Sequence, residues 1–186
     1  MAKLPQHPGA GQLAVAVSKE DHATGAPLAD AAAVLVEYGD YECPTCAATQ
    51  PDVENLLAHF GDRLAFVFRH FPLTTVHPRA SVAAQAAEAA AAQGQFWPMH
   101  RALYARPGGE ATDDLERLAL RVGLETYKFN GDITAGTYAA RVATDVEGGK
   151  ASGVSGTPTF FLDGRRLSRD PKEALAEIRH FLQDKA

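Results

Sequence analysis

The sequence has only two cysteines among 186 residues and no long apolar run. A membrane-spanning helix needs about 18 or more consecutive apolar residues. Near the N-terminus the longest apolar run is "LAVAV" at 13–17, which is also shorter than the roughly 7 to 15 residues of a secretory h-region. We therefore expect a cytoplasmic protein without a membrane span, whereas a chain trimmed of a leader would be periplasmic or secreted.

An excess of basic residues is missing as well. Lys and Arg number 18 against 23 Asp and Glu, so the formal net charge is -5. A nucleic-acid-binding surface needs a basic excess or a basic stripe to neutralise phosphates, so we expect no nucleic-acid partner. The hydrophobic share of 46% and the charged share of 22% are typical of a globular protein, and the length suffices for a sizeable core without disulfides.

The N-terminal part of the chain shows little patterning. Residues 1–30 mix Pro, Gly, His and Ala without a clear period, which predicts an extended, loosely attached arm with no role in the core. The first strong strand signal is "AVLVEY" at 33–38, ended by Gly39 and Asp40. Such a short, continuous β-branched run is typical of a strand buried on both faces.

An amphipathic pattern follows the two cysteines and predicts a helix at about 44–60. Its apolar members recur at helical spacing: Val53, Leu56, Leu57 and Phe60. "LAFVF" at 64–68 is a second continuous apolar run. The order strand, helix, strand has a crossover long enough for parallel pairing of the two strands.

The middle of the chain is predicted to be helical. Alanine, the best helix former, dominates 77–104 until Gly94 interrupts it, which predicts two helices. Further helices are predicted at 112–124, which has an N-cap threonine and acids in its first turn, and at about 134–148. Residues 78–150 therefore form an all-helical block between two parts that contain strands.

The C-terminal part returns to strands and ends in a helix. "TPTFFLDGRRLS" at 157–168 reads as a hairpin with Asp163 and Gly164 in its turn. Asp170 is placed as an N-cap, with Pro171 at the first helical position and an acid three residues after the cap. The resulting order, β-α-β, helical block, β-β-α, defines an α/β protein.

The two cysteines lie in "YECPTC" at the junction of a strand and a helix, where a C-x-x-C pair indicates a redox dithiol. With Pro44 in the first helical turn, the Cys43 sulfur lies beside unpaired backbone N–H groups that favour a thiolate. We expect Cys43 to be the nucleophile. Cys46, three residues on, returns deeper on the same side and is expected to resolve the mixed disulfide. This chemistry needs no bound cofactor or metal.

Other interpretations of the pair remain. A zinc site could add two histidines such as His70, His77 or His100, although no pair has the H-x3-5-H spacing. A static disulfide would close a very short loop and gain little entropy. A simple buried thiol is disfavoured because Cys43 is expected at an exposed helix start. The alternative function is a non-catalytic module that binds a peptide near Pro158 or a metal at the cysteines.

The segment "EYGDYECPTC" resembles the active site of the thioredoxin superfamily, and more closely that of its DsbA-like thiol-disulfide oxidoreductases. Glu37, six residues before Cys43, matches a buried acid in that family, so the resemblance implies a role in proton transfer. Pro51 matches a proline that kinks the first helix of many members. Thr45 departs from the family, since oxidases of this type usually have histidine there, so the resemblance leaves the direction of electron flow open.

A second segment, "GVSGTPTFFLDG" at 153–164, resembles the family's cis-proline segment. The resemblance implies a cis bond between Thr157 and Pro158, a position opposite Cys43, and backbone pairing of this segment with a substrate peptide. Protein or small thiol and disulfide substrates are implied, with an electron-transfer partner. "AAAAQGQFWPMHRALY" resembles the family's helical insert, in which Trp97 and its neighbours are expected to form core.

The implied fold is a thioredoxin fold with an all-helical insertion between the second and third core strands. The implied parts are an N-terminal arm, a first half with the C-x-x-C pair, the insertion, and a second half with the cis-proline: residues 1–30, 31–77, 78–150 and 151–186.

Overall fold

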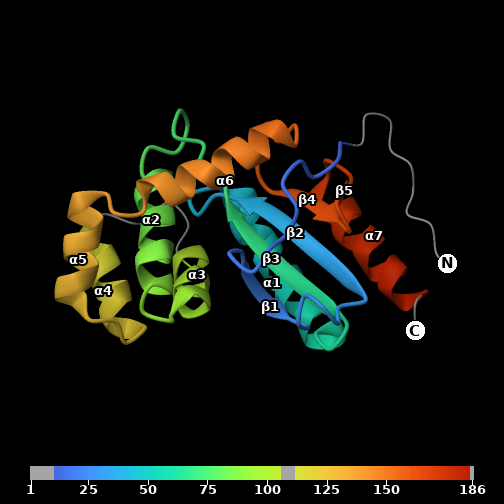
Figure 1. The fold of residues 1–186 in the computed structure, drawn as a ribbon, viewed down its shortest axis with the longest axis horizontal. Helices are drawn as coiled ribbons and strands as arrows, with labels where there is room; N and C mark the ends of the chain where they lie inside the picture. Colours follow the sequence, from blue (N-terminus) through green and yellow to red (C-terminus); the bar gives the residue numbers. More distant parts are fainter. Residues whose placement is uncertain (1–10, 106–111, 185–186) are drawn as a thin grey trace. The chain divides into compact units, whose positions relative to one another are not determined.

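The computed structural model of the protein describes residues 11–105 and 112–184 (Figure 1). The chain divides into two compact units. The sheet unit comprises the described parts of Met1–Gly39, Ala48–Arg69 and Gly148–Ala186, and the helical unit comprises those of Asp40–Ala47 and His70–Glu147. Among the described residues, no helix is both long enough and apolar enough to cross a membrane.

A five-stranded sheet has the order β1-β3-β2-β4-β5. Its strands are β1 (His22–Gly25), β2 (Ala33–Gly39), β3 (Leu64–His70), β4 (Thr159–Leu162) and β5 (Arg165–Arg166). β1 pairs antiparallel with β3, β2 with β4, and β4 with β5. Every residue of β3 is buried, and in β2 all but one are. The two continuous apolar runs of the sequence therefore form β2 and β3, neighbouring strands inside the sheet, and both are buried as predicted.

The N-terminal segment corrects one prediction. Residues 11–30 are not a loosely attached arm, because β1 places Thr24 opposite Phe66 of β3 and Ala26 is 4% exposed. The backbone N–H of Leu13 also donates to the carbonyl of Gly164, at 2.8 Å. A short edge strand such as "HATG" needs no apolar period of its own, because its partner strand supplies the pairing. Residues 1–10 lie outside the described part of the chain.

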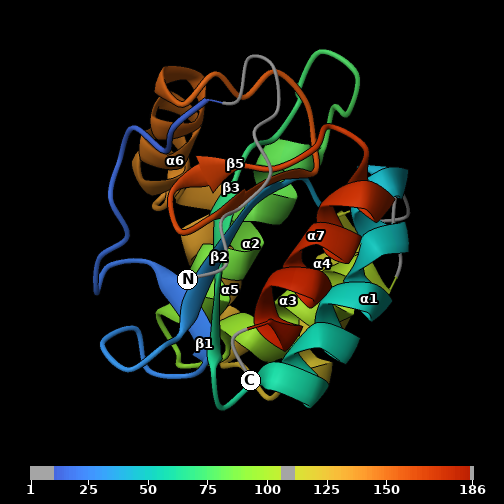
Figure 2. The same ribbon diagram turned by 90° about the vertical axis from the view of Figure 1, so that its right-hand side faces the viewer.

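Two helices lie side by side on one face of the sheet, α1 (Pro44–Phe60) and α7 (Pro171–Gln183) (Figure 2). The bounds of α1 and the start of α7 agree with the prediction. Asp170 is the N-cap of α7, since its Oδ1 accepts hydrogen bonds from the backbone N–H groups of Lys172 and Glu173 at 2.9 and 3.1 Å. The carboxylate of Glu173 accepts from the Ser168 hydroxyl at 2.7 Å.

The hairpin between β4 and β5 turns at Asp163 and Gly164, both of which have positive φ, 48° and 79°. Positive φ at both central residues is the geometry of a type I′ hairpin turn, for which Asp-Gly is a preferred sequence. The turn is also anchored to β2, because Val34 N–H donates to Asp163 Oδ1 at 2.8 Å and Asp163 N–H donates to the Val34 carbonyl at 2.9 Å.

Between β3 and β4 the described residues form five helices: α2 (Ala80–Ala91), α3 (Phe96–Tyr104), α4 (Thr112–Arg121), α5 (Thr126–Ala135) and α6 (Ala139–Ala151). The helix expected at about 134–148 corresponds to α6, which begins five residues later and ends three residues later, whereas α5 was not predicted. Gly136, with φ 64°, is the left-handed C-cap that ends α5. The side chains of Phe96 and Met99 are core, 5% and 0% exposed, as expected.

Candidate active site

Cys43 lies directly before the first residue of α1. Its carbonyl accepts the first helical hydrogen bond, from Ala47 N–H at 3.1 Å, while its own N–H donates to the carbonyl of Asp40 at 3.1 Å. Cys43 is therefore in the N-cap position, and Pro44 follows at the first helical position, where its missing N–H costs nothing. This position exposes the sulfur to the positive end of the helix dipole, which favours an anion.

The two cysteines are buried, whereas the two residues between them are exposed to solvent. Cys46 is 0% and Cys43 is 6% exposed, whereas Pro44 and Thr45 are exposed. The expectation of an exposed Cys43 is wrong for its side chain, because the preceding residues are themselves buried and bonded to the segment before α2. The deeper position of Cys46 agrees with its expected role. The two thiols are not joined in a disulfide in this structure.

Asp40 organises the backbone on both sides of Cys43. Its side chain is 2% exposed, and Oδ1 accepts from the backbone N–H of Glu42 at 2.8 Å. Oδ2 accepts from the backbone N–H of Leu73 and from Nδ1 of His77, each at 2.8 Å. One carboxylate thus connects the turn before α1 to the segment that leads into α2.

Glu42 makes a second connection of the same kind. This side chain, 8% exposed, accepts from Arg79 N–H through Oε2 at 2.7 Å and from Arg79 Nε through Oε1 at 3.2 Å. Asp40, Glu42 and Arg79 were not predicted as site residues, and His77 was considered only as a zinc ligand. Their signal in the sequence is weak, two acids just before the dithiol and "HPR" at 77–79, and neither pattern says which groups will pair.

His77 has an altered titration. Burial by itself lowers its pKa, but the hydrogen bond to Asp40 and the charge of Asp40 raise it, as do the charges of Cys43 and Glu42, so the net pKa lies above the ordinary 6.5. The ring is 20% exposed. Its protonated, positively charged form is therefore favoured at pH values where an ordinary histidine is neutral.

Tyr41 anchors the same turn in aromatic side chains of the helical unit. A hydrogen bond of 3.1 Å joins its hydroxyl and His100 Nδ1, and its ring centroid lies 4.8 Å from that of Tyr104 and 5.9 Å from that of His70. The turn that carries Cys43 is thus held by Asp40, Tyr41 and Glu42 in succession, which limits the positions that the sulfur can take.

The histidines considered for a zinc site have other partners. His70 Nε2 lies 2.9 Å from Glu88 Oε1, His77 bonds Asp40 and His100 bonds Tyr41. Within 11–105 and 112–184, no cluster of three or more suitable ligand atoms includes either cysteine.

Glu37 and the proline segment lie on neighbouring strands of the sheet unit. Glu37, on β2, is 0% exposed, and Gln50 Nε2 donates to its Oε2 at 3.2 Å. β4 starts directly after Pro158, and Glu37 is opposite Phe160 in the register of β2 and β4. The Thr157–Pro158 peptide bond is cis. The position of this segment opposite Cys43 stays a prediction.

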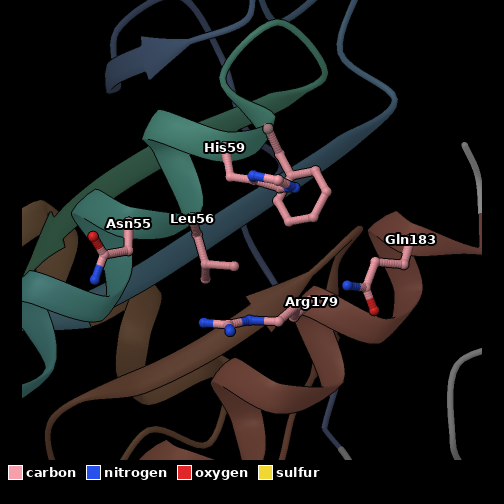
Figure 3. Close-up of a pocket in the computed structure, with 6 residues that line it drawn as sticks. Asn55, Leu56, His59, Arg179 and Gln183 are labelled. Atoms are coloured by element: carbon pink, nitrogen blue, oxygen red, sulfur yellow. The ribbon is translucent and has the colours of Figure 1, made fainter.

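A separate pocket of about 340 Å³ lies between α1 and α7 (Figure 3). Its lining comes from the end of α1 and the last turns of α7: Asn55, Leu56, His59, Phe60, Arg179 and Gln183. Along α1, His59 is more than four turns beyond Cys43, about 24 Å at 1.5 Å per residue. Neither cysteine lines this pocket.

With its all-helical insertion between β3 and β4, the fold is the thioredoxin fold in the form that DsbA-like proteins have. A family model described as Thioredoxin matches residues 17–184. The chain belongs to the thioredoxin family.

Two solved structures are similar over almost the whole chain. BdbD from Bacillus subtilis, in its oxidised form, has a TM-score of 0.80 at 22% identity and covers 95% of this chain and 96% of its own. A thioredoxin-like oxidoreductase from Silicibacter pomeroyi has a TM-score of 0.75 at 25% identity, covering 91% and 95%. These likenesses support the fold.

Curated relatives are closer in sequence but much longer. The chain is 47% identical over 146 residues to a Salinispora arenicola protein named Na(+)/H(+) antiporter NhaA 1. The matched stretch covers 78% of this chain and 22% of that protein. The chain spans about a quarter of the length of the curated relatives that it matches.

Proposed function

We propose that this chain is a thiol-disulfide oxidoreductase that works through Cys43 and Cys46. The observation that carries the proposal is the place of the pair on α1, with Cys43 in the N-cap position and Cys46 fully buried one turn on. The helix N-terminus favours the Cys43 thiolate, which is the reactive form of a cysteine. Membership of the thioredoxin family and the likeness to solved oxidoreductases support the same chemistry.

In the reducing direction, the Cys43 thiolate attacks one sulfur of a substrate disulfide. The Cys43–substrate S–S bond forms, the substrate S–S bond breaks, and the other substrate sulfur leaves as a thiolate. Cys46, after loss of its proton, attacks Cys43 Sγ and releases the second substrate sulfur. Two electrons pass to the substrate, which becomes a dithiol, and Cys43 and Cys46 become a disulfide. The oxidising direction is the reverse of these steps.

Two further roles belong to this proposal. Glu37 transfers the proton that Cys46 loses, and its burial on β2 together with the Gln50 hydrogen bond supports an acid kept away from bulk water. Thr157 and Pro158 bind the substrate, a role that the family resemblance implies and that their place directly before β4 supports.

The antiporter name of the relatives is not carried over to this chain. The match covers only 22% of the Salinispora arenicola protein, so the name of the whole protein does not assign an activity to this chain. We propose protein or small-molecule thiols and disulfides as substrates, a separate electron-transfer partner, and a cytoplasmic location.

An insulin-reduction assay tests the proposal, with dithiothreitol or glutathione as reductant. We expect turnover by the wild type, none by Cys43→Ser, and a trapped mixed disulfide with Cys46→Ser. If the wild type shows no turnover and the Cys46→Ser variant traps no mixed disulfide, the chain is instead a non-catalytic module that binds a peptide or a metal.

The direction of electron flow follows from the equilibrium reduction potential of the pair against glutathione. A value within the cytosolic poise, roughly -220 to -320 mV, supports a reductase, and a clearly more positive value supports an oxidase.

A further inference from the structure

The immediate surroundings of Cys43 contain more negative than positive side chains along the chain. Asp40 and Glu42 lie within three residues before it, both are at most 8% exposed, and Thr45 brings no charge between the cysteines. Like charges nearby disfavour a further anion. A thiolate at Cys43 therefore needs a positive charge besides that of the helix N-terminus.

Two cations approach this acidic turn from the segment before α2. Arg79 is engaged with Glu42 through both its backbone N–H and its Nε, and its side chain is 39% exposed against 20% for His77, so solvent screens the charge of Arg79 more. His77 bonds Asp40 Oδ2 through Nδ1 at 2.8 Å. A protonated imidazole donates Nδ1–H to Asp40 and retains a second N–H, on Nε2, together with the delocalised positive charge of the ring.

The same carboxylate holds both partners in place. Asp40 accepts the His77 ring through its side chain, while its backbone carbonyl accepts the N–H of Cys43 at 3.1 Å. His77 is therefore attached, through one buried residue, to the backbone that positions the sulfur.

We propose that His77, positioned by Asp40, supplies the positive charge that stabilises the thiolate of Cys43. This inference rests on the proposed function, in which Cys43 is the attacking thiol. His77 acts through Cys43 and is a positioning residue, not one that touches the substrate. It takes the place of the charge that Thr45 does not bring to the site.

The stabilisation of the Cys43 thiolate by His77 is therefore limited to the pH range in which His77 is protonated. The charged groups that face His77 are Asp40, Glu42, Cys43 and, through Glu42, Arg79. His77 carries its charge below its raised pKa and loses it above, so its help to the thiolate is confined to the lower pH range. The favourable interaction is reciprocal, so the thiolate must in turn favour the protonated ring.

The first test measures the rate of alkylation of Cys43 by iodoacetamide against pH, in the Cys46→Ser background. His77→Gln is expected to lower the rate about threefold to tenfold near pH 6, because fewer molecules carry the thiolate. His77→Lys, which keeps a cation, should restore much of it. His180→Gln is the matched control, since His180 also pairs with an acid, Asp184 at 3.3 Å, but is 76% exposed on α7.

The second test reads the same interaction from the histidine side and does not require a His77 variant to fold. NMR titration of His77 in the reduced protein and in Cys43→Ser should give a lower His77 pKa when the thiolate is removed. Equal titrations in the two proteins, or equal alkylation profiles for wild type and His77→Gln, would overturn the inference.

The two proposals fail separately. Insulin turnover by the wild type with an unchanged alkylation profile in His77→Gln rejects only the role of His77. If the wild type shows no insulin turnover but His77→Gln still shifts the alkylation profile of Cys43, the oxidoreductase function is rejected and the His77–Cys43 interaction is kept.

Discussion

Gln50 on α1 donates its side-chain amide to the carboxylate of Glu37 on β2, with 3.2 Å between Nε2 and Oε2, and both side chains are buried. The contact joins the helix that begins at the dithiol to the strand that precedes it. The acid in this contact, Glu37, is the residue proposed to transfer the proton of Cys46, and this role can be measured.

Glu37→Gln keeps the shape and the burial of the side chain but removes the proton acceptor. We expect the resolving step, attack of Cys46 on the mixed disulfide, to slow about tenfold to a hundredfold at neutral pH, within the range of general acid–base catalysis. Stopped-flow release of a fluorescent thiol from Cys43 measures this step. The free energy of unfolding should stay equal or rise by about 1 kcal/mol, because no charge is buried. An unchanged rate would remove Glu37 from the mechanism.

Arg69 ties the N-terminal segment to the sheet. Its Nε donates to Asp21 Oδ1 at 2.7 Å, its Nη1 donates to the Val15 carbonyl at 2.9 Å, and its side chain is 3% exposed. Arg69→Met removes the cation that pairs with the buried Asp21 carboxylate, so we expect a loss of about 3 to 5 kcal/mol in the free energy of unfolding by urea. The double variant Asp21→Asn with Arg69→Met should recover part of this loss. A change below about 1 kcal/mol would contradict the argument.

His77 makes stability depend on pH in a defined direction. Its pKa in the folded protein is raised above the unfolded value of 6.5, so the stabilisation is fully present below about pH 6.5 and disappears as the pH rises through the raised pKa. The difference in unfolding free energy between wild type and His77→Gln should therefore be larger near pH 5.5 than near pH 8.5. Urea titrations at both pH values measure it, and a larger difference at the higher pH would contradict the ion pair with Asp40.

Two glycines should respond oppositely to the same change. Gly164 has φ 79° in the β4–β5 turn, whereas a Cβ on Gly131 within α5 would meet nothing within 4 Å. Gly164→Ala should cost about 1 to 2 kcal/mol because left-handed backbone is strained for alanine. Gly131→Ala should add about 0.5 to 1 kcal/mol because alanine favours the helix. Thermal unfolding compares the two, and the same sign for both would exclude this explanation.

The elements with strong local patterns could be predicted from the sequence. The runs at 33–38 and 64–68 became β2 and β3, the apolar stripe became α1, and Asp163-Gly164 became the hairpin turn. Each signal lies within the element that it predicts. β1 was missed because "HATG" has no period of its own. α5 was missed because its N-cap is Glu125, a residue type that is uncommon at this position.

The candidate site divides in the same way. Spacing and the helix start were enough to identify Cys43 and Cys46 as a redox pair, and the family resemblance pointed to Glu37 and to Thr157–Pro158. The burial of Cys43 and the pairing of His77 with Asp40 were not foreseen.

The sequence by itself determined the dithiol, the helix that begins beside it and the alternation of strands and helices, because these depend on residue types at short, regular spacing. Only the tertiary structure decided which acid faces which base around Cys43. Asp40 and His77 are brought together by the course of the chain through α1 and β3, and no local propensity encodes the 2.8 Å between them.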